Sequence, residues 1–266
     1  MPDSSRSSRT RRSLDRYRSA LHATIQEFYG SALKPEVEEF QSEEELVALF
    51  THHLNRERGG IKTEELDQYQ AQGEETLRAW YQSEDDPFHF NVLLERSFTL
   101  QLPSGVEVSG RIDRVDIDPK STLGMPVDYK IGEAREVKTG PYTSGKRKGE
   151  FRELEDRRWR QLAYYAILLR DGLNKGGQPR TGKLVNLSPR GTVVQLVDLN
   201  PEAVAQFEEE LYRVYHEILD CEDYSGCRED EHKTDRERES CAWCKFHYLK
   251  RDGVELVSEE VEGLDE

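Results

Sequence analysis

The sequence predicts an α/β fold in which a central sheet is flanked by helices. Over the first third of the chain the apolar residues recur at steps of three and four, which is typical of helices packed on a core. From about Val92 the period changes to two, which is typical of strands. One helical segment then interrupts the strand segments and another follows them, so the expected order is α, then β-β-β-α-β-β-α.

The N-terminal part is predicted to be helical. The first helix is lined by one apolar stripe: Leu14, Tyr17, Leu21, Ile25 and Phe28. We expect it to end at Gly30, and we expect residues 1–13, which are rich in Ser and Arg, to be a disordered basic arm. Ser42 and Glu45 form a capping-box pattern at the start of a second helix, and a third is expected over residues 66–80.

The later elements follow from the same periodicities. They are expected at 92–102, 106–117 and 125–131 (strands), 156–170 (helix), 183–187 and 192–199 (strands), and in a last helix capped by Asn200 with Pro201 in its first turn. We expect one domain over residues 14–252, made of a helical part (14–90), a core (91–220) and a cysteine-containing tail (221–252), and then an acidic tail (253–266).

Composition restricts the class of protein. The net charge is −15 with 34% charged residues, which favours a soluble molecule, and no segment reaches the roughly 20 apolar residues that cross a bilayer. With no signal-peptide pattern at Met1, we expect a cytoplasmic protein whose four cysteines are thiols or metal ligands. The acidic total does not exclude nucleic acid as a partner, because binding depends on the local field.

The second strand carries several charged residues. Alternation places Arg111, Asp113, Val115 and Ile117 on one face and Ile112, Arg114, Asp116 and Asp118 on the other. Asp113 then shares its face with apolar neighbours, whereas Asp116 lies on what we expect to be the wetter side. Asp113 is therefore the carboxylate whose burial needs an explanation.

The third strand supplies an acid and a base on one face, because Asp128 and Lys130 are two residues apart. Carboxylate oxygens are the ligands that hard divalent cations prefer, and such a cation can activate water for phosphodiester hydrolysis. An adjacent ammonium can orient that water or stabilise negative charge. The alternative is an ordinary cross-strand salt bridge.

Three segments together carry a family resemblance: residues 110–116 (Gly-Arg-Ile-Asp-Arg-Val-Asp), 127–132 (Val-Asp-Tyr-Lys-Ile-Gly) and 161–165 (Gln-Leu-Ala-Tyr-Tyr). From about Tyr17 to His247 the chain resembles the RecB-type branch of the PD-(D/E)XK nuclease superfamily, found at the ends of UvrD-like and AddAB-like helicase-nucleases. The resemblance implies a restriction-endonuclease-like core with a mixed central sheet.

The same resemblance implies roles for individual residues. Asp113 and Asp128 would bind Mg²⁺ or Mn²⁺ with the backbone carbonyl of Tyr129, and Lys130 would act on the water. Gln161 and Tyr165, one helical turn apart, would line the active centre or touch the DNA backbone. His22 matches an upstream histidine that serves as a further metal ligand, although a histidine beside an apolar stripe is more often a packing residue. Glu95 resembles a first-strand glutamate of the family and could equally be a surface charge.

A basic loop follows the third strand. The residues of this loop that we expect to hold a DNA backbone are Lys138, Lys146, Arg147 and Lys148. Gly140, Gly145 and Gly149 would suit a mobile flap over substrate, and an ordinary solvated loop is the alternative.

The C-terminal cysteines have metal-ligand spacing in Cys241-Ala242-Trp243-Cys244, with Cys221 and Cys227 upstream. Related nucleases hold an iron-sulfur cluster with an earlier cysteine and a further C-terminal one. This chain has no cysteine before Cys221, and Lys250 stands at the last position. The open outcomes are a rearranged 4Fe-4S cluster, a Zn²⁺ site that includes other cysteines or His247, and no metal.

The expected function is metal-dependent hydrolysis of DNA. The substrate would be single-stranded or unwound DNA, cut by an exonuclease-type enzyme working with a separate helicase chain in repair or recombination, because the sequence contains no Gly-x-x-x-x-Gly-Lys-[Ser/Thr] loop. One alternative is a catalytically silent nucleic-acid-binding or scaffold module, which the complete Asp113, Asp128 and Lys130 set disfavours. Another is a zinc-stabilised protein-interaction domain, which leaves the carboxylate pair unexplained.

Overall fold

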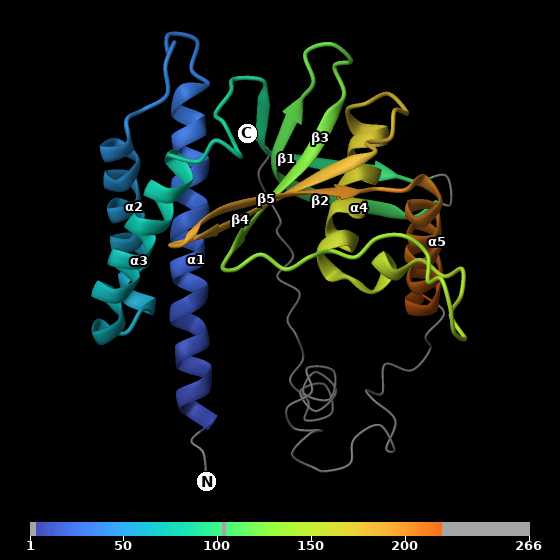
Figure 1. The fold of residues 1–266 in the computed structure, drawn as a ribbon, viewed down its shortest axis with the longest axis horizontal. Helices are drawn as coiled ribbons and strands as arrows, with labels where there is room; N and C mark the ends of the chain where they lie inside the picture. Colours follow the sequence, from blue (N-terminus) through green and yellow to red (C-terminus); the bar gives the residue numbers. More distant parts are fainter. Residues whose placement is uncertain (1–3, 103–104, 220–266) are drawn as a thin grey trace, which may run out of the picture. The chain divides into compact units, whose positions relative to one another are not determined.

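The computed structural model describes residues 4–102 and 105–219, and Figure 1 shows their arrangement. The chain divides into two units, Met1–Tyr212 and Arg213–Glu266. All the residues that the sequence predicts to be catalytic belong to the first unit. Of the second unit, the described part is residues 213–219, which end helix α5 (Pro201–Leu219).

The sheet has five strands in the order β1-β2-β3-β4-β5. Their bounds are β1 (Val92–Gln101), β2 (Glu107–Ile117), β3 (Gly124–Ile131), β4 (Thr181–Ser188) and β5 (Gly191–Asp198). β3 and β4 pair in parallel and the other neighbours are antiparallel, so the predicted mixed sheet is confirmed. Helix α4 (Arg157–Gly172) supplies the crossover that a parallel pair requires.

Helices cover both faces of this sheet (Figure 1). One face is covered by α1 (Ser4–Ala32), α2 (Glu43–Glu57) and α3 (Thr63–Tyr81), whose apolar residues share a core with Val127, Tyr129 and Val185 of the strands. The other face is covered by α4, on which the first part of α5 packs through the Trp159–Phe207 ring contact. Two short 3-10 helices, η1 (Arg58–Gly60) and η2 (Arg152–Glu155), complete the described elements.

Helix α1 is longer at both ends than the apolar stripe indicates. It begins at Ser4, so the predicted disorder of residues 4–13 is corrected. That stretch contains neither Gly nor Pro and is rich in Arg, a good helix former, and adding turns to an existing helix costs little. The helix also runs past Gly30 to Ala32, because Tyr29 and Ala32 are both buried in the core.

Local signals at the other helix ends are confirmed. Ser42 caps α2 in the predicted capping box with Glu45. The Asp156 side chain caps α4 by accepting hydrogen bonds from the backbone N–H groups of Arg158 and Trp159, and Asn200 Oδ1 accepts one from Glu202 N at 2.8 Å. These caps fix where the helices that flank the sheet begin.

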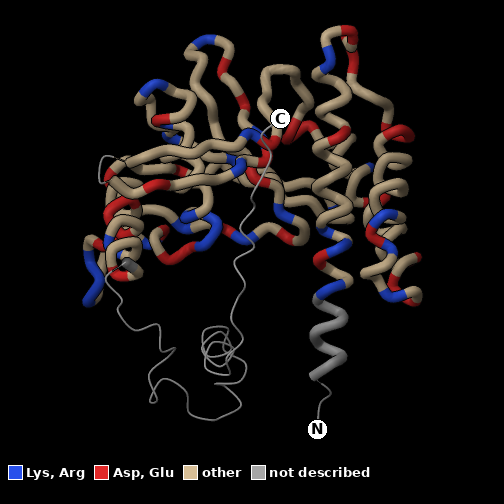
Figure 2. Tube along the Cα trace, turned by 180° about the vertical axis from the view of Figure 1, so that it is seen from behind, with Lys and Arg blue, Asp and Glu red and all other residues tan. Residues whose placement is uncertain are grey.

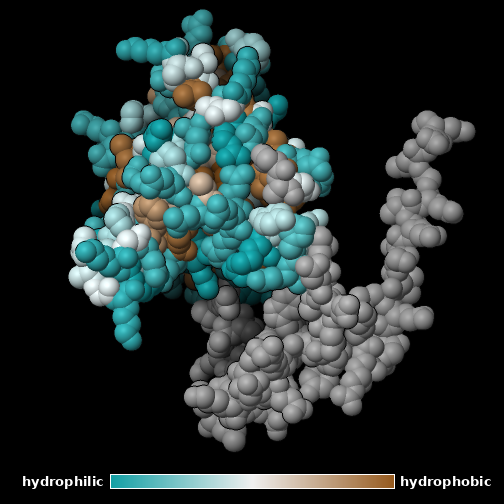
Figure 3. All heavy atoms as spheres, turned by 90° about the vertical axis from the view of Figure 1, so that its right-hand side faces the viewer, coloured by the Kyte–Doolittle hydropathy of each residue, from teal (hydrophilic) through white to brown (hydrophobic). Residues whose placement is uncertain are grey.

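The surface carries mixed charge. Lys and Arg positions alternate with Asp and Glu positions along the described chain in Figure 2, and the face shown in Figure 3 is mostly hydrophilic with small separate apolar patches. Within the described residues no helix is long and apolar enough to span a membrane.

We predict that the contact between α2 and α3 depends on Gly73. A methyl group at Gly73 would lie 2.0 Å from Cζ of Phe50, which is fully buried and cannot swing aside. Gly73→Ala should therefore lower the free energy of unfolding by about 1–3 kcal/mol, although alanine is intrinsically the better helix former.

Gly30 is the matched control, because a methyl group there meets nothing within 4 Å. Gly30→Ala should stabilise the protein by up to about 1 kcal/mol. Urea denaturation of both variants checks this pair, and equal stability of the two would contradict the packing described for Phe50.

Candidate active site

Acidic residues meet where β2 and β3 stop pairing. The last β2–β3 pair is Arg114 with Val127, so the next residues, Asp113 and Asp128, stand on either side of the opening between the strands. On the other side of β2, Leu94 pairs with Arg114 and Arg96 with Ile112, which leaves Glu95 facing Asp113. Three strands thus contribute one carboxylate each to a single row.

Glu95 interrupts its strand with a left-handed backbone, with φ of 47°. Such a conformation is unfavourable for a residue with a side chain and clusters at functional sites. Its carboxylate lies 2.7 Å from Arg111 Nε, and burial together with the charge of Asp113 raises the pKa of Glu95 despite Arg111. The geometry places this glutamate at the carboxylate row.

A relay of polar contacts connects the row to helix α4. Lys130 Nζ lies 2.6 Å from Asp128 Oδ2 and donates a hydrogen bond to Gln161 Oε1 at 2.7 Å. Gln161 in turn donates to Tyr165 Oη at 2.9 Å. The structure therefore brings Asp128, Lys130, Gln161 and Tyr165 together as one connected set. The hydrogen bond that Lys130 donates to Gln161 orients the ammonium group.

His22 of α1 reaches the same place from the opposite side of the opening, with Nδ1 3.8 Å from Asp113 Oδ2. Burial lowers the pKa of His22 more than the charge of Asp113 raises it. The imidazole is therefore neutral at pH 7, and neutral imidazole is the form that binds metal ions.

Asp128 is the most deeply buried of the three acids in the row, with its side chain 2% exposed. Burial raises its pKa to about 6, against the opposing effects of Lys130 and Arg158. Its Oδ2 accepts no hydrogen bond from the described residues, although Lys130 Nζ is close enough for an ion pair. Such an oxygen is suited to a cation, which would compensate its desolvation.

The row fits a divalent metal in its chemistry. Its donors are carboxylate oxygens and an imidazole nitrogen, the set that Mg²⁺ and Mn²⁺ accept. In the described ranges no three His, Cys, Asp or Glu side chains are already gathered at metal-binding spacing. The Tyr129 side chain points to the other face of the sheet and is buried there, which leaves the backbone carbonyl as its only group for a metal.

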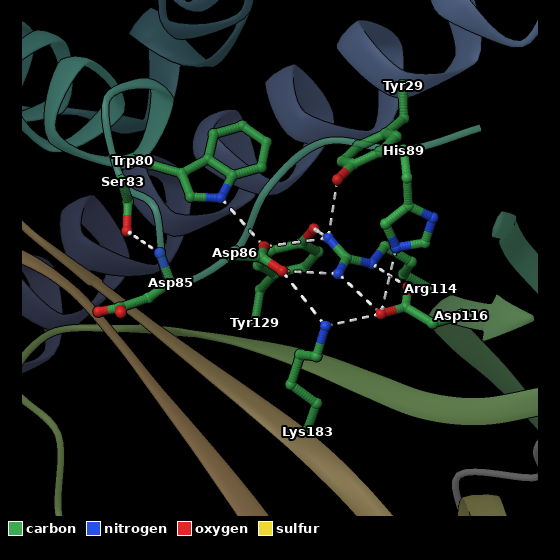
Figure 4. Close-up of polar contacts among 10 residues, drawn as sticks. All are labelled: Tyr29, Trp80, Ser83, Asp85, Asp86, His89, Arg114, Asp116, Tyr129 and Lys183. Atoms are coloured by element: carbon green, nitrogen blue, oxygen red, sulfur yellow. Dashed lines mark hydrogen bonds and ion pairs between the residues drawn. The ribbon is translucent and has the colours of Figure 1, made fainter. Parts of the chain in front are cut away.

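The prediction that Asp116 lies on the more solvent-exposed face of β2 is wrong. Arg114 is 0% exposed and Asp116 is 7% exposed, whereas the Asp113 side chain is 24% exposed. Because helices cover both faces of the sheet, the charged face of β2 also faces a core, and Asp116 is held there by Arg114 and Lys183 (Figure 4). The alternation itself is confirmed, since Asp113 and Asp116 lie on opposite faces.

The sequence did not indicate this buried ion network. Its other acid, Asp86, lies in a polar loop before β1 that reads as exposed, and it becomes buried because it pairs with Arg114. The one available signal was Arg114 itself, a charged residue between the apolar Ile112 and Val115.

The basic loop after β3 is partly ordered by its own contacts. Pro141 pairs with Phe151, and Arg147 forms ion pairs with Glu150 and Glu155 and lies over the Tyr142 ring. The charge of Arg147 is therefore largely used within the loop. Lys138, Lys146 and Lys148 belong to the same segment, and their binding to DNA remains a prediction.

Arg158 is nearer to the carboxylates than those loop residues. It lies one helical turn before Gln161 on α4, and its charge lowers the pKa of Asp128. Its guanidinium donates to the backbone carbonyl of Arg135 at 2.9 Å, and in the part of the chain that the structure covers it has no carboxylate partner. Its positive charge remains available beside the row.

A groove of about 660 Å³ is lined by residues of α1 and α2 together with Leu94 and Glu95 of β1. Two acids on its wall are already paired, Glu27 with His53 and Glu57 with Arg16. The groove thus adjoins one end of the carboxylate row. The predicted cysteine ligands, Cys221, Cys227, Cys241 and Cys244, lie outside the described residues, as does the acidic tail.

The five-stranded mixed sheet, its flanking helices and the row with its lysine define a restriction-endonuclease-like α/β protein. The model of the PD-(D/E)XK nuclease superfamily matches residues 6–249. The chain belongs to this superfamily.

A solved structure described as a putative exonuclease from Eubacterium rectale is similar to the chain, with a TM-score of 0.38 and 14% identity over 74% of this chain and 79% of that one. No curated protein matches the sequence.

We predict that Asp128 weakens the metal-free fold at neutral pH. Its pKa is about 6 in the folded protein against an ordinary value of 3.8, so well below pH 4 the group is protonated in both states. Between about pH 4 and 6 the folded protein keeps a proton at this site that the unfolded chain has lost, so stability falls as the pH rises across this window, by up to about 3 kcal/mol in all.

Asp128→Asn should therefore melt above the parent protein at pH 8 in EDTA, with a difference that shrinks toward pH 4. Thermal denaturation across this range measures it. A difference that does not depend on pH would show that ionisation of Asp128 is not the cause.

Proposed function

We propose that this protein is a RecB-like, divalent-metal-dependent deoxyribonuclease whose catalytic residues are Asp113, Asp128 and Lys130. The observation that carries the proposal is the convergence of the carboxylate row and the Asp128–Lys130–Gln161 contacts at the opening between β2 and β3. A buried carboxylate with a raised pKa beside an oriented ammonium has little structural benefit and is typical of catalysis.

The surroundings of each residue indicate its role in metal binding or in catalysis. Asp113, Asp128, the Tyr129 carbonyl and the neutral His22 would hold Mg²⁺ or Mn²⁺. The bound ion would polarise the phosphate and lower the pKa of water. Lys130, held in place by Gln161, is positioned to orient the attacking water or to stabilise the charge that develops on phosphate.

Tyr165 remains a neutral hydrogen-bond donor in this scheme. Burial raises its pKa to about 12, so the phenol keeps its proton at any physiological pH. Its hydroxyl already accepts from Gln161 and has its own proton to donate. This arrangement supports a role for Tyr165 in binding a phosphate oxygen of the substrate.

We further propose exonuclease-type action on single-stranded or unwound DNA, with a separate helicase supplying the strand during repair or recombination. The support is the resemblance of the three motif segments to helicase-associated nucleases. The groove that Glu95 helps to line supports passage of a strand beside the row.

Lys130→Ala should reduce metal-dependent cleavage by about 100-fold or more, because it removes a charged group that acts on the reacting atoms. The assay uses linear and circular, single- and double-stranded DNA with Mg²⁺, Mn²⁺ or EDTA. Lys120→Ala is the matched control, since Lys120 is exposed in the turn at the far end of the same hairpin, and it should retain full activity.

The outcomes separate the candidate functions. Loss of cleavage in Lys130→Ala and in EDTA supports the enzyme. A parent protein that binds DNA and cuts none of the substrates under any metal condition would instead support a silent binding module.

We predict that Arg158 contacts a substrate phosphate. Arg158→Ala should weaken DNA binding and reduce the slope of log K against log salt by about one, because one phosphate contact is lost. The neighbouring exposed Arg157→Ala and the internally paired Arg147→Ala should change the slope much less. Fluorescence anisotropy over a salt series measures all three variants. A larger change of slope in Arg147→Ala than in Arg158→Ala would indicate that the loop contacts the DNA and that Arg158 does not.

A further inference from the structure

Figure 4 shows a buried ion network. By strand alternation it lies on the face of the sheet opposite the carboxylate row. Its charged members are Asp86, Arg114, Asp116 and Lys183, and its hydrogen-bonding neighbours include Tyr29, Trp80, His89 and Tyr129. Arg114 and Asp86 are almost completely buried, and Asp116 is nearly so. The network joins α1, α3, the loop before β1, and strands β2, β3 and β4.

Arg114 is the centre of the network, and all three nitrogens of its guanidinium have partners. Nε and Nη2 donate to Asp116 at 2.6 and 3.0 Å, and Nη2 and Nη1 donate to Asp86 at 2.7 and 3.1 Å. Nη1 also donates to the hydroxyls of Tyr29 at 2.9 Å and Tyr129 at 2.5 Å. A guanidinium held from four directions fixes the strand that carries it.

Stability alone is a weak reason for such a network. The desolvation of buried ion pairs often cancels their attraction, and apolar residues of similar volume can serve the fold equally well. Where buried charges have a clear benefit, it is that they select one arrangement of neighbouring segments. The question is therefore which arrangement this network selects.

The network lies directly behind the site. Arg114 is the residue of β2 that pairs with β3 and with β1 immediately before the carboxylate row begins. Tyr129 lies between Asp128 and Lys130 in β3, so its hydroxyl is bound behind the sheet while its two neighbours project in front. The Arg114–Tyr129 hydrogen bond thus connects the two strands at the point where their backbones separate.

We propose that Arg114 and Tyr129 are positioning residues that set the separation of Asp113 and Asp128, and thereby the affinity of the row for its metal ion. The inference rests on the proposed metal-dependent function and adds the residues that tune it. Without the Tyr129 hydroxyl, β3 loses the side-chain hydrogen bond from Arg114 of β2, which joins the two strands beyond their last backbone pair. Asp128 and Lys130 then move relative to Asp113.

The test compares two substitutions that remove one hydroxyl each from the same guanidinium nitrogen. Tyr129→Phe removes the hydrogen bond between Arg114 and β3, and Tyr29→Phe removes the hydrogen bond between Arg114 and α1. Both tyrosines are buried, so a purely structural network predicts similar decreases in Tm and no difference at the metal site.

We expect Tyr129→Phe to weaken Mn²⁺ binding by the metal-free protein about 10-fold or more, the usual effect of losing an outer contact of a metal ligand. Tyr29→Phe should stay within about twofold of the parent. Titration calorimetry with Mn²⁺ alone measures this without substrate. In cleavage assays Tyr129→Phe should lose more activity with Mg²⁺ than with Mn²⁺, because Mg²⁺ demands stricter geometry.

Equal Mn²⁺ affinities for the parent and both variants would overturn the inference, as would equal losses in the two variants. A parent protein that binds Mn²⁺ and cleaves DNA while Tyr129→Phe behaves like Tyr29→Phe rejects the positioning role alone. A parent that binds no Mn²⁺ and cuts no DNA rejects the proposed function and this inference together.

Discussion

The site depends on one constraint, the end of backbone pairing between β2 and β3 at Arg114 and Val127. Beyond this pair β2 and β3 no longer pair with each other, so their facing edges are not joined by ladder hydrogen bonds. Asp113, Asp128 and Lys130 are the first residues past the separation, and Glu95 faces Asp113 from β1 at a break in its own ladder. A regular sheet would bring the same side chains into cross-strand contact and leave no room for an ion between them.

The separation has an electrostatic consequence. Three carboxylates in one row repel each other, and the deepest of them, Asp128, has its pKa raised mainly by burial. Lys130 offsets part of this, but it is 29% exposed and is also bonded to Gln161, so it does not neutralise the row. The fold keeps these acids close because the strands are fixed from behind, where the fully buried Arg114 joins both of them. Repulsion within the carboxylate row lowers the stability of the metal-free protein, and a bound cation would restore it.

The sequence predicts most of the fold because its signals are local. The change of period at Val92, the capping residues Ser42 and Asn200, and the two-residue step from Asp128 to Lys130 each determine an element or a face without knowledge of the tertiary structure. Which face is buried is not a local property. Alternation separates Asp113 from Asp116 correctly, but only the helices packed on both faces decide that Asp116 is buried and Asp113 half-exposed. Asp86 shows the same limit, because its burial depends on Arg114, 28 residues away.

The placement of charge also limits how an acidic protein can approach a polyanion. The chain carries a net charge of −15, and the carboxylate row itself repels phosphate. A favourable local field therefore needs cations close to the row, since opposite charges farther away are screened over about 10 Å at moderate salt. Arg158 and Lys130 meet this requirement, whereas Arg147 is neutralised by Glu150 and Glu155. A divalent metal ion in the row would cancel most of its negative charge, so metal binding and substrate binding in this site are expected to be coupled: each would strengthen the other by the same factor.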